Sequence, residues 1–545
     1  MEEVREVSSH VGASSLPPAR VRASLKEAAK TLGGSRCLIN DLALEVLGMI
    51  LLYAVEPMDT PSGNMIWPPA TLISKFAVED LKNVCGGWRA ICLTMPALCN
   101  TIYDNRYSRL EPSVVEAVVK HRTLPLNVCV NRDYPSPAIM KLFQTCGSRV
   151  RNLHVYSSRD LSLQLPLRCL EYCTNFQAPA LEHLTINGDA FDGGFLTPTL
   201  FQGQVLHLKT LSLWNSAWLP ANRFNSLTHL FISTSIRQST RVPSDRNIRW
   251  AMRDLLSFIS GCPNLEDLLL WNILLGCPPA IDTSAVTLRR LKRFAIGRPS
   301  PEHATWLLRH IMCPADSVAI RILNMSCKTN QLRALLPTLP LLDARIAQIQ
   351  KTFNRLSVSF ANGSSAVSIE IDCWPKWNAT SWPTLWASWP RLAGVRELYL
   401  VGMEVVLTEH FAGIPSLLRQ LSALVTLVYC DIGPPDKLLK YLSQTLHGMP
   451  CPRLETLHIY RPEDMPVNIV ELVEFMEARA CAGYKLRRLI LEFSAEVPDG
   501  LRASVGRLGD LVEIVEVREN GGVGPRAPWP AVCSETTHKS FWPAW

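Results

Sequence analysis

The chain has 545 residues, of which 47% are hydrophobic, so it is long enough for more than one domain and apolar enough for a large core. Its formal net charge is only +7 and it has no run of five basic residues, so a nucleic-acid-binding surface is not indicated. The 17 cysteines show no paired CxxC spacing, which argues against zinc ribbons and disulfide frameworks. We therefore expect a reducing intracellular location, cytoplasmic or nuclear, with no metal and no cofactor. The longest apolar stretch, residues 42–55, is too short to span a bilayer, so we expect no membrane association.

The sequence of the N-terminal part predicts a mobile segment, residues 1–35, followed by a small helical module, residues 36–104. Asn40-Asp41 is a good helix cap, and Leu44, Leu47 and Leu51 follow it at helical spacing. A second helical stripe, after a proline-rich loop, consists of Leu81, Val84, Cys85, Trp88, Ile91, Cys92 and Met95. Two short amphipathic helices cannot bury their apolar faces alone, so this module needs a larger body or a partner.

Three blocks of this module carry a family resemblance: Leu42-Ala43-Leu44-Glu45-Val46-Leu47, Val84-Cys85-Gly86-Gly87-Trp88-Arg89 and Thr94-Met95-Pro96-Ala97-Leu98. In this order they resemble the F-box, most closely that of F-box proteins common in basidiomycete fungi. The pattern departs from the family at Ala43, at Gly86-Gly87 and at Cys99. The resemblance implies a helical module that binds the Skp-type adaptor of a cullin ubiquitin ligase. The adaptor contacts implied by position are Leu42, Leu44, Val46, Leu47, Ile50, Leu51, Val84, Cys85 and Trp88.

A six-residue unit, apolar-x-x-apolar-x-apolar, recurs through the rest of the chain, as in Leu181-Glu-His-Leu184-Thr-Ile186 and Leu454-Glu-Thr-Leu457-His-Ile459. Most copies start 25 to 32 residues apart, which is the signature of an irregular leucine-rich repeat. The last two apolar residues would alternate inward on a short strand, and the first would pack from the preceding turn. The predicted fold class is therefore α/β, with an irregular leucine-rich-repeat solenoid over residues 105–517, a curved parallel sheet inside and helices outside.

The segments between these units locate the other predicted elements. The sheet is expected to begin near residue 124, with residues 124–130 as its first strand, and the middle, residues 318–375, is expected to contain an insertion or a hairpin. A tail, residues 518–545, has no periodicity and is expected to be flexible or loosely packed. The predicted helices are residues 248–259, 303–311, 332–352, 417–424, 436–446 and 467–480.

The hollow of such a solenoid predicts a target-binding surface. Residues that flank the inward leucines point into it, and exposed aromatic rings on a rigid sheet are good anchors for a protein partner. The candidate target-binding residues are Tyr156, Trp214, Phe231, Trp271, Tyr399, His458 and Tyr460. An equally open alternative is that neighbouring strands and loops cover these rings.

No catalytic motif stands out, so we expect a non-catalytic adaptor subunit rather than an enzyme. The resemblance implies a substrate-recognition subunit of a Skp–cullin–F-box ubiquitin ligase, in which the module binds the adaptor, and through it a cullin, while the repeats bind a target protein. One alternative is a leucine-rich-repeat scaffold with a degenerate F-box and no ligase role. Another is a hydrolase or transferase within residues 318–390, where the nearby acids are Asp343, Glu370 and Asp372.

Overall fold

The structure is a computed structural model, and it divides the chain into two compact units, residues 1–58 with 73–99 and residues 59–72 with 100–545. We call these the helical unit and the sheet unit. The fold class is mixed α/β with a large, mostly parallel sheet. The structure describes residues 42–54, 75–95, 98, 100–105, 110, 112–120, 123–132, 135–156, 172–187, 198–216, 218–234, 252–273, 284–314, 317–326, 329–339, 343–352, 355–372, 386, 389, 392–402, 413–430, 435–444, 449–461, 468–494, 497, 506–519, 524–534 and 542. The mobile segment predicted over residues 1–35 lies outside these.

The described part of the helical unit contains α2 (Leu44–Ala54), α3 (Lys75–Lys82) and α4 (Gly86–Thr94). Its core is a cluster of buried side chains from all three helices and from Leu98: Leu47, Leu51, Val78, Ile91, Cys92 and Leu98. Cys85 caps α4, since its Sγ accepts a hydrogen bond from the backbone N–H of Trp88 at 3.5 Å. Gly86 and Gly87 thus occupy the first turn of α4, where glycine costs less than in a helix interior.

The sheet unit is built on a sheet of 17 described strands. Their pairings give the spatial order β1, β2, β3, β4, β5, β6, β7, β9, β11, β14, β13, β12, β15, β16, β17, β18, β19. The strands are β1 (Thr101–Asn105), β2 (Leu126–Asn131), β3 (Val150–Tyr156), β4 (His183–Asn187), β5 (Thr210–Trp214), β6 (His229–Ser233), β7 (Asp267–Trp271), β9 (Arg293–Gly297), β11 (Ala319–Met325), β12 (Ile346–Thr352), β13 (Arg355–Ala361), β14 (Ala366–Asp372), β15 (Glu397–Val401), β16 (Thr426–Cys430), β17 (Thr456–Arg461), β18 (Arg488–Phe493) and β19 (Ile514–Glu519). A separate parallel pair joins β8 (Val286–Thr287) to β10 (Ile311–Met312).

The repeated six-residue pattern explains how each strand packs. The two alternating apolar residues of a strand, such as Leu184 and Ile186 on β4, enter one continuous buried core. Register keeps them in rows, because Leu184 lies opposite Leu211 and Ile186 opposite Leu213 on β5. Leu511 of the last unit is only half-buried, but the first apolar residue of most other units is buried and packs from the preceding turn, as expected. These residues are Leu181, Leu208, Leu227, Leu265, Leu291, Val395, Leu424, Leu454 and Leu486.

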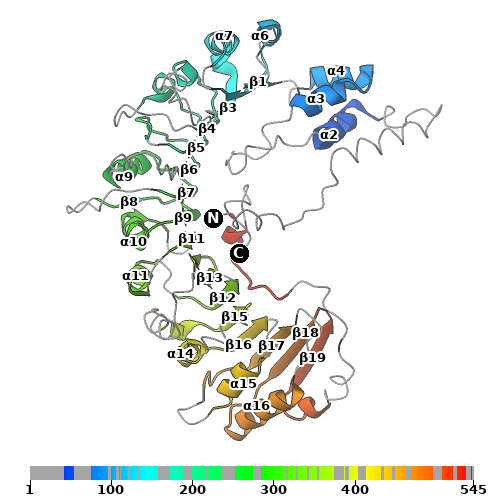
Figure 1. Cartoon of the computed structure of the whole chain (residues 1–545), viewed down its shortest axis with the longest axis vertical. Coiled ribbons are helices and arrows are strands. Elements are labelled where there is room, and N and C mark those ends of the chain that lie inside the picture. The colour runs from blue at the N-terminus through cyan, green and yellow to red at the C-terminus, as the bar shows by residue number, and fades with distance from the viewer. Residues whose placement is uncertain are drawn as a thin grey trace, which may run out of the picture. The chain divides into compact units, whose positions relative to one another are not determined.

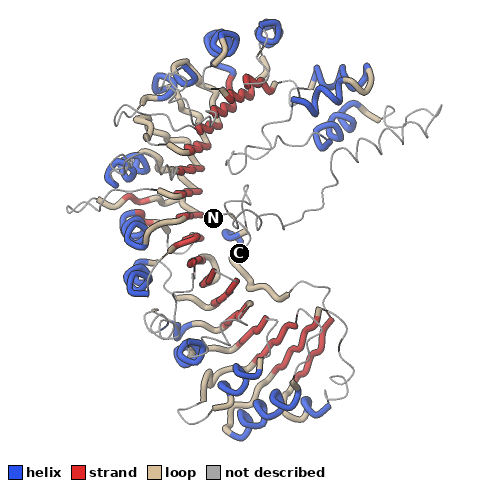
Figure 2. Tube along the Cα trace, viewed as in Figure 1, coloured by secondary structure: helices blue, strands red, loops and turns tan. Residues whose placement is uncertain are grey.

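Helices lie along the core side of the sheet, and the strands follow an arc with the helices on its outer side (Figures 1 and 2). We call the opposite face, which none of the described α-helices covers, the inner face. The helices are α6 (Pro112–Lys120), α7 (Pro137–Cys146), α9 (Met252–Ser260), α10 (Pro301–His310), α11 (Thr329–Leu335), α14 (Gly413–Gln420), α15 (Asp436–Leu442) and α16 (Ile469–Cys481). The short 3-10 turns are η2 (Gly147–Arg149), η3 (Leu200–Gly203), η5 (Leu336–Thr338), η6 (Leu392–Gly394) and η7 (Ala531–Cys533).

One buried cation ties α16 to its neighbours. The Arg479 side chain is fully buried and donates hydrogen bonds to three backbone carbonyl oxygens, those of Pro450 at 3.0 Å, Cys451 at 3.0 Å and Tyr484 at 3.3 Å. Its guanidinium lies over the Phe475 ring, 5.9 Å from the centroid. Burial lowers the pKa of this arginine. The hydrogen bonds stabilise the turn on either side of the helix, because buried carbonyl groups need donors.

The predicted insertion in the middle of the sheet is confirmed and its form is now defined. The strands β12, β13 and β14 form an antiparallel meander, while β14 pairs in parallel with β11 and β12 pairs in parallel with β15. Along the sheet these three strands therefore lie in the order β14, β13, β12, which is the reverse of their order in the sequence. The predicted helix 332–352 is wrong in its second half, because residues 346–352 form β12. Pairing with two neighbours overrides the helical spacing of Ile346 and Ile349.

The two ends of the sheet unit also differ from expectation. The sheet begins at β1, before the predicted first strand, so the helical unit ends at residue 99 rather than 104. At the other end, β19 extends to Glu519, and residues 524–534 and Trp542 are packed rather than loose. The expected flexible tail is therefore wrong for those residues. The remaining predicted helices are present with boundaries shifted by a few residues, as α9, α10, α14, α15 and α16.

Candidate functional site

Helix α2 presents apolar side chains on both of its sides. Leu47 and Leu51 face the core of the helical unit, while Val46, Met49 and Ile50 are exposed on the opposite side. A helix that is apolar all round belongs in a fully buried setting, so the exposed side is suited to a partner. Leu42 and Leu44 at the start of α2 are exposed as well, and so is Val84 in the turn before α4, with Leu44 and Val84 exposed by 67% and 58%. We call these six residues the α2 surface.

The predicted adaptor contacts thus separate into three groups. Leu42, Leu44, Val46, Ile50 and Val84 are exposed. Leu47 and Leu51 are buried, with 4% and 0% exposure, and pack in the core of the helical unit, so direct contact with an adaptor stays a prediction for these two. Cys85 and Trp88 are half-buried, since one caps α4 and the other packs against the core. The sequence pattern missed Met49, which the exposed side of α2 adds.

The seven predicted target-binding residues lie on the inner face, but the structure contradicts their expected exposure. Six of them are buried: Tyr156, Trp214, Phe231, Tyr399, His458 and Tyr460. Trp271 is half-buried. The alternative that other parts of the chain cover the rings is therefore the correct one for these residues. What covers many of them is the segment of residues 524–534 together with Trp542, which we call the returning segment.

The returning segment crosses the inner face from β17 toward β5. Gly524 lies against Tyr460 and Cys430, since a Cβ at this glycine would be 3.0 Å from the Tyr460 ring and 3.1 Å from the Cys430 sulfur. Ala527 joins a buried cluster with Tyr399 and Val428, and Trp529 packs against that cluster. Cys533 and Trp542 belong to a second inner-face cluster, together with Trp214, Phe231, Leu269, Ala295, Ala319, Ala361 and Ala366. Figure 1 shows the described part of the segment beside the strands of the inner face.

Small side chains on the inner face make room for the returning segment. Ala295, Ala319, Ala361 and Ala366 stand where bulky residues would fill the surface, and Cys533 and Trp542 complete the cluster. Gly297 serves a related purpose, because a Cβ there would be 2.0 Å from the ring of Trp271. The Trp542 indole N–H donates to the carbonyl oxygen of Cys533 at 2.7 Å. The guanidinium of Arg321 lies 5.5 Å from the centroid of the same indole.

A row of polar side chains on and beside β6, β7 and β9 has the residue types of a catalytic site. His229 Nε2 lies 3.1 Å from an Asp267 carboxylate oxygen, Arg293 forms two hydrogen bonds with the same carboxylate, and Thr228 Oγ1 lies 2.7 Å from His229 Nδ1. Burial would raise the pKa of Asp267, but the hydrogen bonds from His229 and Arg293 outweigh it and hold that pKa below its usual value. This is the composition of a hydroxyl–imidazole–carboxylate triad, but the hydrogen bond between the hydroxyl and the imidazole has the opposite direction from that in a catalytic triad.

Thr228 Oγ1 donates its one proton to the carbonyl oxygen of Lys209 at 3.0 Å, so it accepts from His229 Nδ1. A hydroxyl that accepts a hydrogen bond from the imidazole is not activated as a nucleophile by it. The row therefore holds neighbouring strands together. His458 makes a similar cross-strand contact, with its Nε2 2.8 Å from Glu492 on β18. Burial lowers the pKa of His458, against the opposing effect of Glu492.

The carboxylates proposed for a hidden enzyme do not form a catalytic pair. Glu370 and Asp372 both lie near Arg355, at 3.0 and 3.7 Å, and Asp343 is exposed. In the described part of the chain, no group of three or more metal-ligating side chains could hold a metal ion. None of the described helices is long and apolar enough to cross a membrane.

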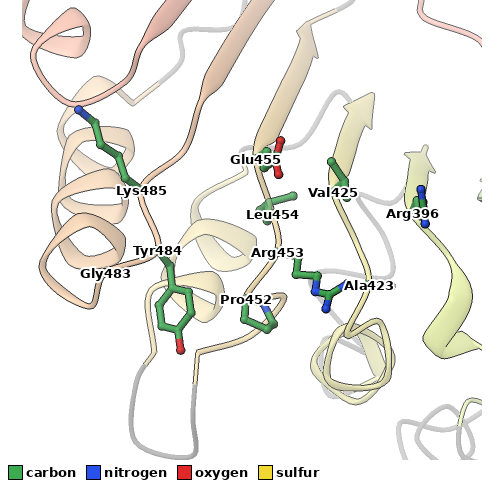
Figure 3. A pocket seen from close by; sticks show the side chains of 10 residues that line it. All are labelled: Arg396, Ala423, Val425, Pro452, Arg453, Leu454, Glu455, Gly483, Tyr484 and Lys485. Atoms are coloured by element: carbon green, nitrogen blue, oxygen red, sulfur yellow. The ribbon is translucent and has the colours of Figure 1, made fainter.

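An open hollow of about 570 Å³ lies at the edge where β15 to β18 begin, and Figure 3 shows its lining. It contains more cations than anions: Arg396, Arg453 and Lys485 against Glu455. In Figure 3 the Arg396 and Lys485 side chains lie at opposite ends, and the Tyr484 ring points away from both. These charges do not converge on one point, so the hollow offers no built site for an anion.

Comparison of the chain with models of known protein families gives no match, and comparison with curated proteins gives none either. The candidate functional surfaces of the chain are therefore the two described above, the α2 surface and the inner face.

Proposed function

We propose that the chain is the substrate-recognition subunit of a Skp–cullin–F-box ubiquitin ligase. In this proposal the helical unit is an F-box module that binds a Skp-type adaptor, and the sheet unit is an irregular leucine-rich-repeat solenoid that binds a target protein. The chain itself performs no chemistry. It contributes proximity, because holding a target near a charged conjugating enzyme makes the transfer step effectively unimolecular.

The observation that carries the proposal is the α2 surface. Leu42, Leu44, Val46 and Val84 come from the sequence blocks that resemble the F-box, Met49 and Ile50 continue the same helix, and all six are exposed although Leu47 and Leu51 of α2 are well packed. Contiguous exposed apolar groups on a folded unit mark interaction sites. The placement of Gly86 and Gly87 in the first turn of α4 supports the same reading, because this departure from the family pattern costs the helix little.

The test is capture of the adaptor from the organism that encodes the chain, using purified full-length protein. We expect nanomolar to micromolar binding by the wild type and a loss of at least about 100-fold for the double variant Leu44→Asp, Ile50→Asp, because each acidic group would be desolvated at the interface. Leu206→Asp is the matched control, since Leu206 is 75% exposed in the sheet unit and should tolerate the same change.

A folded wild-type protein that fails to bind the adaptor would refute the ligase proposal. It would favour the scaffold with a degenerate F-box, for which Ala43, Gly86-Gly87 and Cys99 are the sequence arguments. Equal binding by the double variant and the control would place the contact elsewhere and remove the observation on which the proposal rests.

A further inference from the structure

We propose that the inner face is a peptide-binding surface whose resident ligand is the returning segment, and that a target binds by displacing it with an extended, proline-flanked segment that carries tryptophan. The part that concerns a target rests on the proposed function. The part that concerns peptide binding does not, because it follows from how residues 524–534 and Trp542 are attached.

The core of the sheet unit is formed without the returning segment. The large buried cluster that runs under all the strands contains no residue of 524–534 and does not include Trp542. The segment enters only the two small clusters on the inner face. Removing it would therefore uncover a surface and would not empty the core.

The segment is attached as a ligand would be. Its described backbone hydrogen bonds close small turns within it, from Trp529 to Ala527, from Cys533 to Pro530 and from Ser534 to Ala531. It does not extend the sheet as an additional strand, since β19 is the last strand in the pairing order. Gly524, Ala527, Trp529, Val532, Cys533 and Trp542 pack against the inner face, and Arg321 lies over the Trp542 ring, while Arg526, Pro528, Ala531 and Ser534 are exposed.

The chemistry of the surface specifies the kind of peptide that fits. The four alanines of the second cluster leave space for a large flat ring, and the Arg321 guanidinium lies over the ring that occupies it. Trp529 stands between Pro528 and Pro530, which restrict the backbone to extended conformations and lower the entropy lost on binding. An extended segment with tryptophan beside proline therefore matches both the room and the charge on the inner face.

Covalent attachment makes the resident ligand a strong competitor. Only residues 520–523 separate the end of β19 from Gly524, and a short linker gives an effective concentration in the millimolar range. If the segment itself binds the empty surface with a Kd of about 10 μM, the surface is open in only about 1% of molecules, and a free peptide then binds the intact chain roughly 100-fold more weakly. A target thus needs either high affinity or a second contact to open the surface.

The experiment uses the full-length chain with a specific protease site in place of residues 520–523, cleaved after folding. The probe is a fluorescent synthetic peptide of residues 524–545, read by anisotropy. We expect the cleaved chain to exchange its own fragment for the probe, and the intact chain to bind the probe at least about 100-fold more weakly. A probe with Trp529→Ala and Trp542→Ala should lose binding, whereas one with Arg526→Ala should keep it, since Arg526 is exposed.

A second variant avoids cleavage. The intact chain carrying Trp529→Ala and Trp542→Ala should bind the wild-type probe about 100-fold more tightly than the unmodified chain does. A merely structural segment would not produce this gain. Random displayed peptides selected on this variant should be enriched in tryptophan next to proline.

Three results would overturn the inference: no probe binding to a folded cleaved chain, equal binding to the intact and cleaved chains, or selection of peptides without tryptophan. None of these assays contains the adaptor, so their failure is distinct from failure of the ligase proposal.

Discussion

The position of Cys533 allows a direct chemical measurement of whether the returning segment is seated. Its thiol is buried in the inner-face cluster, and burial raises its pKa from 9.0 to about 12, against a smaller opposing effect of Arg321. Three pKa units lower the fraction of reactive thiolate at pH 8 about 1,000-fold. Cys481, in the last turn of α16, is exposed and serves as the internal reference. Reaction in the seated state is therefore negligible, and we expect alkylation of Cys533 to be roughly 100-fold slower than that of Cys481, because it proceeds through the roughly 1% of molecules in which the segment is displaced.

The perturbation is Trp542→Ala. Trp542 is 3% exposed, and truncation of a buried tryptophan costs about 3–5 kcal/mol. If the whole loss falls on the seating equilibrium, the segment is mostly displaced in the variant, and Cys533 should react up to about 100-fold faster. Arg526→Ala, a change at an exposed position of the same segment, should alter the rate by less than about twofold.

The assay is timed alkylation of the native protein followed by mass spectrometry of the peptides that contain each cysteine. Cys262 separates local opening from unfolding, because it is fully buried in the core of the sheet unit and should remain protected in both variants. Reaction of Cys533 within threefold of Cys481 in the folded wild type would refute the seated segment. An unchanged rate in the Trp542 variant would show that this ring does not hold it.

Three further predictions concern stability and the inner face. Arg479→Met should lower the free energy of unfolding by about 3 kcal/mol or more in urea titrations, because the buried carbonyl groups of Pro450 and Cys451 and the part-buried carbonyl group of Tyr484 lose their donor. Arg487→Met, at a side chain with 66% exposure, should stay within about 0.5 kcal/mol, and a similarly small effect of Arg479→Met would contradict this prediction. Gly297→Ala should speed alkylation of Cys533 severalfold, since the new methyl group displaces Trp271 from its cluster, and no change would mean that the ring can shift without loosening the segment. Burial, with a smaller contribution from a neighbouring histidine, lowers the pKa of His154 to about 3, so the folded chain binds fewer protons than the unfolded chain below the unfolded pKa of 6.5. The free energy of unfolding should therefore fall by about 1.4 kcal/mol between pH 7.5 and 5.5 on account of this group, and His154→Gln should remove that part; an identical pH dependence in the variant would show that His154 titrates normally.

The strands could be predicted because their signal is local. Each unit such as Leu454 to Ile459 carries its own alternation of apolar residues, and the structure places a strand there. The signal fails where pairing decides the structure. Residues 346–352 fit a helix and a strand about equally well, and the two neighbouring strands of the sheet select the strand. β1 has no six-residue pattern, so only its pairing with β2 identifies it.

The covering of the inner face could not be predicted from the sequence, for a different reason. The alternation correctly places Trp214 and Phe231 opposite the core, but it does not predict what covers them. The returning segment has no periodicity and contacts strands that lie 64 or more positions earlier (524 − 460 = 64 for Gly524 and Tyr460), so no local pattern can reveal it. Two indirect signals exist: the small residues Ala295 and Ala319 at positions where other strands carry large ones, and the concentration of tryptophan and proline after residue 524.

The separation of the returning segment from its docking surface in the sequence has a consequence for biosynthesis. Translation runs from the N-terminus, so the strands from β5 to β16 are made before residues 524–542. At about 5–20 residues per second, the apolar groups of the inner face stay uncovered for several seconds or more after the first of them leaves the ribosome. Nascent chains of this protein should therefore depend on chaperones during that interval, and premature termination within β19 should yield a product that is folded in its core and yet prone to aggregate.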